Sequence, residues 1–283
     1  MQEEKIKNIL RSYNLKPNFT YGQNFLLDEI VLQDMVDSAE IKTGSVVLEI
    51  GPGIGNLTRK LLETGACVLS VEKDPKFFPI LKALKKEFPE TFWFEISDVL
   101  ECNYEKIFLE KFEIKVLKYS VVANIPYYIT GKILQMIFAK KNKPDSITVL
   151  TQKEVAQNIT AKPGHLSLLA ISVQIYGEPK IIAMVPARAF YPAPKVDSAV
   201  LQIKILNKPQ IIFKDEKKFF SILKACFTGK RKQLHNTLKN NLHLNKETVE
   251  AVLGEAGVSL SARPQELTLK QWENLANKIL ALN

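Results

Sequence analysis

One segment, VLEIGPGIGNLT at 47–58, constrains the fold of this chain more than any other. The apolar run SVVLEI that leads into it predicts a buried strand, and an apolar pattern through Leu62 predicts a helix after it. Between the two, Gly51, Gly53 and Gly55 allow a sharp turn and a close approach of the backbone to a ligand. A strand, a tight turn and a helix in this order form the building unit of an α/β sheet.

The same alternation continues along the chain. The later apolar runs CVLSVE, TFWFEI, KYSVVAN and DSITVLT predict further strands, and helical patterns separate them. Residues 26–40 predict an amphipathic helix before the first strand, and a Pro-rich stretch at 186–194 precedes a last strand, KVDSAVLQIKI. We therefore expect an α/β fold with a doubly wound, mainly parallel sheet.

Charge and composition divide the chain near residue 207. The segment NKPQ resembles a linker, and the pattern after it is helical. Residues 208–283 hold thirteen Lys and Arg against seven Asp and Glu, so they carry +6 of the net charge of +9. We expect a sheet-containing domain at 1–207, which begins with a basic N-terminal arm, and a small basic helical domain at 208–283. A basic domain of this kind indicates a polyanionic partner.

Neither the cysteines nor the histidines are spaced as metal ligands. Cys67, Cys102 and Cys226 are far apart and odd in number, which favours reduced thiols over a disulfide framework or a zinc site. The first residues are polar, and no apolar run is long enough to cross a bilayer. We expect a cytoplasmic protein that binds no metal.

The glycine turn and two acidic residues indicate the class of cofactor. Glu72 ends the second strand, where a carboxylate can accept hydrogen bonds from both ribose hydroxyls of an adenosine, in dinucleotide-binding folds as in methyltransferases. The glycines are spaced GxGxG with Pro52 among them, not the GxGxxG that brings a helix N-terminus onto a pyrophosphate. S-adenosylmethionine has no phosphate, and Asp98, after the third strand, can accept a bond from its adenine amine. Alternatively, Asp98 caps a helix.

The fourth strand ends in Asn124-Ile125-Pro126-Tyr127, which resembles the NPPY-like signature of methyltransferases that act on amino groups of bases. An adenine amine is a poor nucleophile because its lone pair is delocalised into the ring. If the Asn124 side-chain oxygen and the Pro126 carbonyl each accept one N–H bond, the nitrogen becomes more tetrahedral and its lone pair is freed. Tyr127 would stack on the base.

With this motif, nearly the whole chain resembles the small-subunit ribosomal RNA adenine dimethyltransferases. YGQNFL resembles their N-terminal loop, which implies that Gln23, Asn24 and Leu26 lie beside the cofactor. VPARAFYPAPKVDSAV resembles their FxPxPKVDS segment, which implies that Phe190 is a second aromatic face against the target base.

Two C-terminal segments extend the resemblance. CFTGKRKQLHNTL matches a helical segment in which the family usually has paired arginines. Here Lys230 and Arg231 stand at those positions, followed by Lys232, and we expect all three to bind RNA phosphates. Lysine at the first position keeps the charge but loses bidentate geometry. ARPQELTLKQWENLA matches the ending of the family.

The resemblance implies a Rossmann-like class I methyltransferase that uses S-adenosylmethionine to dimethylate two adjacent adenines in a hairpin near the 3′ end of small-subunit (16S) rRNA. The partner is then the assembling small subunit, and no obligatory protein partner is implied. Three alternatives remain. They are a large-subunit rRNA adenine methyltransferase of the macrolide-resistance type, a nucleic-acid-binding factor that lost catalysis, and a small-molecule methyltransferase. The C-terminal segments disfavour a large-subunit methyltransferase. The presence of Asn124, Pro126 and Tyr127 disfavours a factor that lost catalysis, and the basic domain disfavours a small-molecule methyltransferase.

Overall fold

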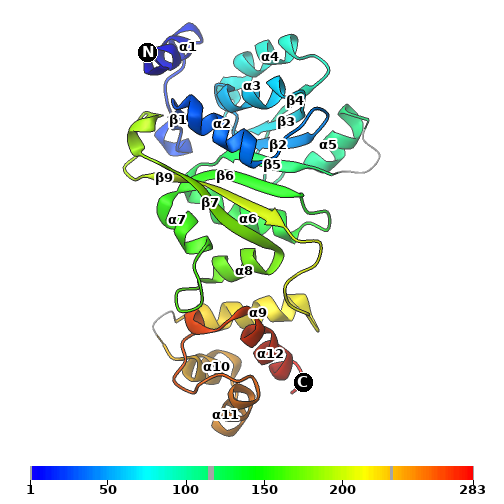
Figure 1. Ribbon diagram of the computed structural model, residues 1–283, viewed down its shortest axis with the longest axis vertical. Coiled ribbons are helices and arrows are strands. Elements are labelled where there is room, and N and C mark those ends of the chain that lie inside the picture. The colour runs from blue at the N-terminus through cyan, green and yellow to red at the C-terminus, as the bar shows by residue number, and fades with distance from the viewer. Residues whose placement is uncertain (1, 114–117, 230–231, 283) are drawn as a thin grey trace. The chain divides into compact units, whose positions relative to one another are not determined.

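The computed structural model describes residues 2–113, 118–229 and 232–282. The chain forms two compact units (Figure 1). The first comprises Met1–Ala156 and Pro179–Ile205, and the second comprises Gln157–Glu178 and Leu206–Asn283.

The strands and helices follow one another in an alternating order over most of the first unit. The strands are β1 (Phe25–Leu26), β2 (Val46–Ile50), β3 (Cys67–Glu72), β4 (Phe92–Ile96), β5 (Ser120–Asn124), β6 (Ser146–Gln152), β7 (Gly177–Val185), β8 (Phe190–Tyr191) and β9 (Ser198–Ile205). The α-helices are α1 (Gln2–Ser12), α2 (Glu29–Ser38), α3 (Asn56–Glu63), α4 (Phe78–Glu87), α5 (Tyr104–Lys111), α6 (Thr130–Ala139), α7 (Lys153–Ile159), α8 (Leu168–Tyr176), α9 (Glu216–Phe227), α10 (Leu234–Leu242), α11 (Lys246–Glu255) and α12 (Leu269–Ile279). Short 3₁₀ turns lie at Phe19–Tyr21, Pro75–Phe77, Tyr127–Ile129, Ala187–Ala189 and Pro264–Glu266.

The expected mainly parallel sheet is confirmed. Seven strands are hydrogen-bonded in the order β4-β3-β2-β5-β6-β9-β7. The pairs from β4 through β6 are parallel, whereas β9 runs antiparallel to β6. The strand order reverses around β2 and β5, and ligands of open α/β sheets bind at such a point, outside the carboxyl ends of the strands.

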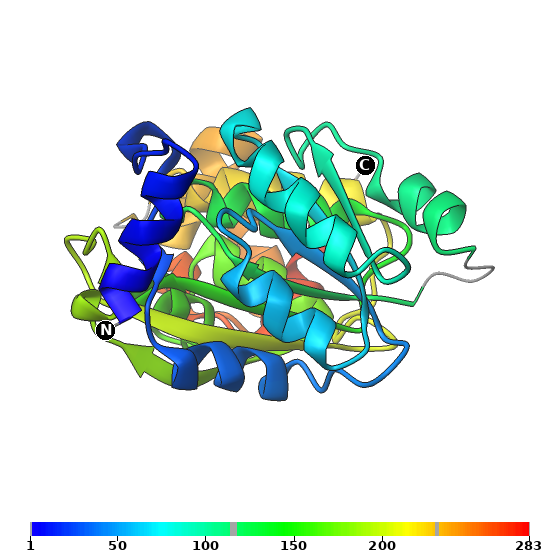
Figure 2. The same cartoon turned by 90° about the horizontal axis from the view of Figure 1, so that it is seen from above.

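Helices cover both sides of this sheet. Figures 1 and 2 show α2 and α3 on one side and α6 on the other. The strands β2 and β3 bury every residue but the first, and β5 buries its three central residues, as expected of strands covered on both faces. A sheet with two apolar faces gives the carboxyl ends of its strands a fixed geometry.

Two parts of the first unit differ from the sequence prediction. Residues 2–12, within the expected basic arm, form helix α1, whose Ile6 and Leu10 are 2% and 3% exposed in the hydrophobic core, a packing that the sequence did not predict. The edge strand β7 was not predicted from the sequence. Only two of its nine residues are buried, so its pattern lacks the apolar run that marks the central strands.

The second unit is helical, as predicted for the C-terminal quarter, but it also includes residues 157–178. Aromatic contacts explain this inclusion. The Tyr176 ring at the end of α8 packs against Phe213 and Phe220, with ring centroids 6.2 and 6.3 Å apart, and its hydroxyl donates to Glu216 at 2.5 Å. The prediction of a single domain boundary at residue 207 does not describe this division, because the chain passes from one unit to the other three times.

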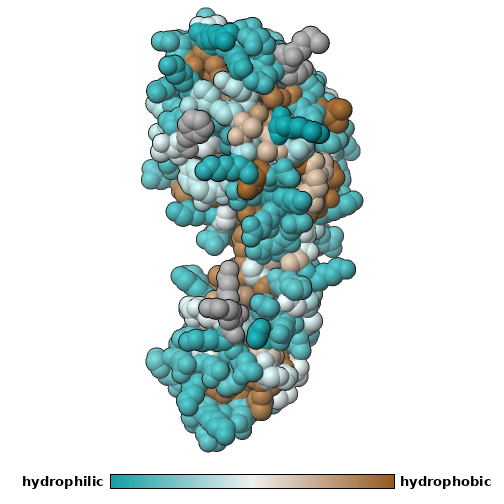
Figure 3. All heavy atoms as spheres, turned by 90° about the vertical axis from the view of Figure 1, so that its left-hand side faces the viewer, coloured by the Kyte–Doolittle hydropathy of each residue, from teal (hydrophilic) through white to brown (hydrophobic). Residues whose placement is uncertain are grey.

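The face of the molecule shown in Figure 3 is mostly polar. Hydrophilic residues predominate on it, and hydrophobic ones form small separate groups. Within the described ranges, no helix is both long and apolar enough to span a bilayer. The same residues contain no group of three or more His, Cys, Asp and Glu side chains that could hold a metal ion.

Candidate active site

The turn between β2 and α3 is built from glycines in the left-handed region. The φ angles of Gly51, Gly53 and Gly55 are 71°, 53° and 81°. Residues with a Cβ rarely adopt such angles, and a Cβ on Gly53 would stand 3.2 Å from the Phe25 ring. The backbone therefore passes close under the N-terminal loop, and substitutions in this turn are strained.

Glu72, the last residue of β3, holds this turn in place. Its Oε2 accepts the Gly53 N–H at 3.0 Å, and its Oε1 accepts the Asp74 N–H at 2.8 Å. The side chain is only 6% exposed, and burial raises the pKa of its carboxyl. Each oxygen keeps a further lone pair, so the carboxylate can still accept hydrogen bonds from a ligand.

Asp98 lies beyond β4, where it bonds to the following turn and pairs with a lysine. Its Oδ1 accepts the Leu100 N–H at 3.0 Å. The next helix, α5, begins at Tyr104 and is capped by Asn103, so Asp98 does not cap a helix, which was the alternative interpretation of this residue. Its Oδ2 pairs with Lys73 Nζ at 2.7 Å, and this hydrogen bond lowers the pKa of the carboxyl. The same contact raises the pKa of the Lys73 ammonium, so both groups are charged at neutral pH.

The N-terminal loop is tied to the ends of β3 and β5. Gln23 donates from Nε2 to Asp74 Oδ2 at 2.9 Å and accepts the Asn18 N–H at 2.8 Å. The Asn24 carbonyl accepts a hydrogen bond from Asn124 Nδ2 at 3.1 Å. These hydrogen bonds therefore hold the N-terminal loop beside the ends of two strands that are distant from it in sequence.

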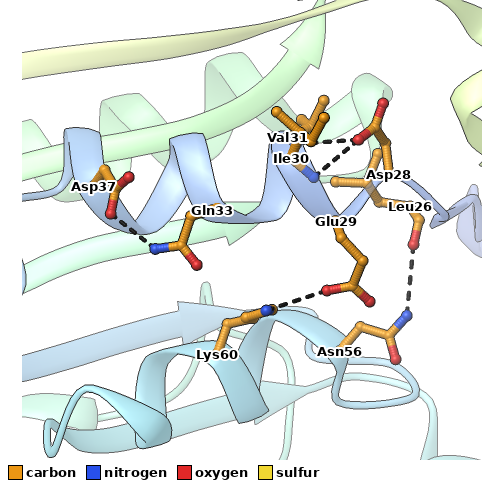
Figure 4. A network of polar contacts seen from close by, with 9 residues as sticks. All are labelled: Leu26, Asp28, Glu29, Ile30, Val31, Gln33, Asp37, Asn56 and Lys60. Atoms are coloured by element: carbon orange, nitrogen blue, oxygen red, sulfur yellow. Dashed lines mark hydrogen bonds and ion pairs between the residues drawn. The ribbon is translucent and has the colours of Figure 1, made fainter.

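A further set of contacts holds the loop over α3 (Figure 4). The Leu26 carbonyl accepts from Asn56 Nδ2 at 3.5 Å, and Glu29 pairs with Lys60 at 3.2 Å. Asp28 caps α2 by accepting the N–H groups of the next turn. Buried Leu26 in β1 also pairs with Phe190 in β8.

The segment after β5 turns at once into a 3₁₀ helix. The Pro126 carbonyl accepts the Ile129 N–H at 3.2 Å, which leaves one lone pair for a substrate amine. The Tyr127 hydroxyl is 2.6 Å from Ser198 Oγ, and burial raises its pKa. Tyr128 is 60% exposed.

Many of these groups line one cavity in the first unit, formed mainly by residues 21–26, 49–54, 71–73, 97–99 and 124–129. The cavity brings together residues that the sequence analysis assigned to the cofactor with three that it assigned to chemistry: Gln23, Asn24, Leu26, Gly51, Gly53, Glu72, Asp98, Asn124, Pro126 and Tyr127.

The remaining predicted residues do not lie in this cavity. Phe190 is 3% exposed, belongs to the hydrophobic core and does not line the cavity, because β8 pairs with β1 and buries the ring. In this arrangement it offers no second aromatic face. Lys232 is exposed in the second unit, whereas Lys230 and Arg231 lie outside the described residues.

Comparison with known proteins identifies the family. Residues 14–280 match the family model described as ribosomal RNA adenine dimethylase. Two relatives named ribosomal RNA small subunit methyltransferase A are similar to this chain. The protein of Clostridium botulinum is 38% identical, and the match covers 96% of this chain and 98% of the relative. The protein of Alkaliphilus oremlandii is 37% identical, and the match covers 98% of this chain and 96% of the relative. The chain belongs to the ribosomal RNA adenine dimethylase family.

Solved structures agree with this membership. The 23S rRNA methyltransferase ErmE superposes with a TM-score of 0.69 at 28% identity, covering 90% of this chain and 99% of its own. A dimethyladenosine transferase from Plasmodium falciparum superposes with a TM-score of 0.73 at 23% identity, covering 89% and 95%, which shows the shared fold. The expected enzyme class, an rRNA adenine methyltransferase that depends on S-adenosylmethionine, is confirmed.

Chemical features of the cavity fit the cofactor of this family. The glycine turn lets the backbone approach a ligand, and Glu72 and Asp98 place carboxylate oxygens, which accept hydrogen bonds, in the cavity wall. A third acid, Glu49, is buried in the wall with its Oε1 unpartnered. Three carboxyl groups and one lysine suit a ligand with a net positive charge.

Several functional candidates were not predicted from the sequence. Glu49 is an acid inside an otherwise apolar strand, and that contrast could have marked it. Lys73 and Tyr128 adjoin predicted residues and line the cavity. Ser198 reaches Tyr127 only through the antiparallel pairing of β9 with β6, a long-range contact that no local pattern reveals.

Proposed function

We propose that this enzyme transfers methyl groups from S-adenosylmethionine to the N6 amines of two adjacent adenines in a hairpin near the 3′ end of small-subunit (16S) rRNA, in the cytoplasm, during subunit assembly. The observation that carries the proposal is the tether of the Asn124 amide nitrogen to the Asn24 carbonyl, because it leaves the amide oxygen for a substrate amine beside the cofactor cavity.

The cofactor would be held by the strand ends and the N-terminal loop. Glu72 would accept hydrogen bonds from the ribose hydroxyls, and Asp98 would accept one from the adenine amine of the cofactor. Gly51 and Gly53 would let the backbone pass close to the cofactor. When bound, the cofactor supplies an electrophilic methyl group on a sulfonium. Gln23 supports the site indirectly, since it binds Asp74 next to Glu72.

The target adenine would be oriented by the segment after β5. The Asn124 Oδ1 and the Pro126 carbonyl accept the two amine hydrogens, and their placement at the end of one strand aligns the nitrogen for transfer. Tyr127, fixed by Ser198, offers a ring for stacking, so an extruded base can be held beside the amine acceptors.

The second unit would supply contacts to RNA phosphates. Its net charge is positive, and lysines bind phosphates without reading sequence. Relatives named for the small subunit are 37–38% identical, whereas the large-subunit enzyme ErmE is 28% identical. This difference supports the small-subunit substrate.

Methyl transfer from radiolabelled cofactor tests the proposal. The acceptors are undermethylated small subunits, free 16S rRNA and large subunits, each at equal RNA concentration. We expect incorporation of about four methyl groups per small subunit, two on each of two adenines, and none in large subunits. Labelling of large subunits alone would replace the proposal with the macrolide-resistance type, and binding without labelling would indicate a factor that lost catalysis.

A further inference from the structure

Glu49 is the most deeply buried acid of the cofactor cavity, and its carboxyl group is only half satisfied. The side chain is 1% exposed. Both of its hydrogen bonds go to one oxygen, Oε2, which accepts from Thr58 Oγ1 at 2.7 Å and from Ser70 Oγ at 2.6 Å. Oε1 has no partner among the described residues. An unpartnered buried oxygen is costly unless a ligand or a proton satisfies it.

The position of Glu49 in the sheet relates this oxygen to the cofactor. Glu49 lies on β2, one residue before Ile50 and the glycine turn, and β2 lies between β3 and β5. Glu72 ends β3 on one side, and Asn124 ends β5 on the other. Glu49 therefore lines the cavity between the proposed ribose acceptor and the proposed amine acceptor. The sulfonium of a cofactor that is held by the first and delivers its methyl group to an amine at the second would lie in this part of the cavity.

Among the described residues, no cation pairs with Glu49. From β3 it faces Glu72, which is also an acid and further disfavours ionisation. From α3 and β3 it faces the uncharged Thr58 and Ser70. The other charged groups of the cavity wall, Lys73 and Asp98, are paired with each other. The N-terminal loop, α2 and β5 contribute no charged side chain to the wall.

We propose that Glu49 is a proton-linked positioning residue, which releases its proton to solvent when the cationic cofactor binds and takes one up again when the cofactor has lost its methyl group. This inference rests on the proposed function. The carboxylate complements the sulfonium of S-adenosylmethionine, whereas S-adenosylhomocysteine has a neutral sulfur and an amino acid group of no net charge. Glu49 would thus favour the substrate over the product.

The direction of the pH dependence follows from burial. Burial raises the pKa of the Glu49 carboxyl to about 7 in the free protein, and a nearby positive charge lowers it. Affinity for S-adenosylmethionine is therefore full above pH 8 and falls as the pH drops through 7, because the proton must then be removed. Between pH 8 and pH 6 we expect a loss of about tenfold. Burial also raises the pKa of the Glu72 carboxyl, but its proposed ribose contact is common to both ligands and cancels in their affinity ratio.

Titration calorimetry of the full chain at pH 7 counts the protons directly. Each ligand is titrated in buffers of different ionisation enthalpy, and the slope of the observed enthalpy gives the number of protons released. The wild type should release about half a proton with S-adenosylmethionine, since a group of pKa about 7 is half protonated there, and distinctly less with S-adenosylhomocysteine. Glu49→Gln should abolish the difference between the ligands and flatten the pH profile of their affinity ratio.

A second variant keeps Glu49 itself. Ser70 lowers the pKa of Glu49 by donating to Oε2, so Ser70→Ala should raise that pKa and increase proton release at pH 7. The inference is overturned if the wild type binds S-adenosylmethionine without releasing protons, or if a folded Glu49→Gln releases as many. Failure of the wild type to bind S-adenosylmethionine at all is a different result, and it would overturn the proposed function.

Discussion

Asn124 donates from Nδ2 to the backbone carbonyl of Asn24 at 3.1 Å, across one hundred residues of chain. The bond joins the end of β5 to the N-terminal loop, which is itself held to Asp74 through Gln23. An amide whose nitrogen is engaged presents its oxygen in a defined direction. The loop that closes the cofactor cavity therefore also orients the side chain that the proposed chemistry requires.

Asn124→Ala should reduce the single-turnover rate of methyl transfer by about 10²–10³, because a preorganised acceptor aimed at the reacting amine is lost. RNA binding, which rests mainly on phosphate contacts, should change little. Single-turnover kinetics on undermethylated small subunits, run beside RNA-binding measurements, separate the two effects. A wild-type rate in the folded variant contradicts the proposed activation of the adenine amine.

Glu72→Ala should weaken cofactor binding by about 1.5–3 kcal/mol, because two ribose hydroxyls lose a charged acceptor. It also leaves the Gly53 and Asp74 N–H groups without their acceptor, so thermal stability should fall as well. Calorimetry with S-adenosylmethionine measures the first effect. Glu63→Ala, which changes an exposed glutamate in α3, is a matched control and should bind the cofactor like the wild type.

Local patterns were sufficient to predict the central strands of the sheet and their ends, but not its edge strand β7. Each of β2 to β6 is a short apolar run next to a turn, and cofactor candidates such as Gly51, Glu72 and Asn124 stand at or just beyond strand ends. Parallel strands place their carboxyl ends at the same edge of a sheet, so this topology brings such residues together. A glycine turn and Glu72 alone also fit a dinucleotide cofactor, and the GxGxG spacing together with Asp98 favoured S-adenosylmethionine.

What the patterns could not predict depends on contacts distant in sequence. Phe190 looked like an accessible aromatic residue, but pairing of β8 with β1 buries it. Residues 26–40 predicted an amphipathic helix, but the pattern does not show which positions are buried: in α2, Ile30 is 73% exposed, whereas Leu32 and Met35 are buried. Helical spacing identifies a helix, but neighbouring segments decide which residues face the core.

Charge reversal at Lys230, Arg231 and Lys232 should weaken binding to small subunits and flatten its salt dependence, because each phosphate contact releases counterions. Cofactor affinity should stay the same. Lys246, Lys270 and Lys278 offer a control of equal charge in the same unit, since each is already paired with a glutamate. If the control reversal has the same effect, net charge and not this segment governs RNA binding.

The last prediction concerns the base, which must leave its stack before an enzyme can reach its amine. Tyr127→Ala should remove about 1–3 kcal/mol of base stacking and so reduce methyl transfer, whereas Tyr127→Phe keeps the ring. The Phe variant loses the hydrogen bond to Ser198, so its free energy of unfolding should be about 1 kcal/mol lower than that of the wild type. It should retain much of the methyl-transfer activity.

Ser198→Ala is the matched control for this pair, because it breaks the same hydrogen bond from the other side and leaves the tyrosine intact. It should resemble Tyr127→Phe in both stability and activity. Phe190→Ala should instead act mainly on stability, with a cost of about 3–5 kcal/mol, since its ring is buried in the core. Denaturant unfolding and single-turnover methylation, measured on all four variants, distinguish the roles. If Phe190→Ala folds normally and loses methyl transfer, the ring must leave the core to meet the base, and the site has a second, open arrangement.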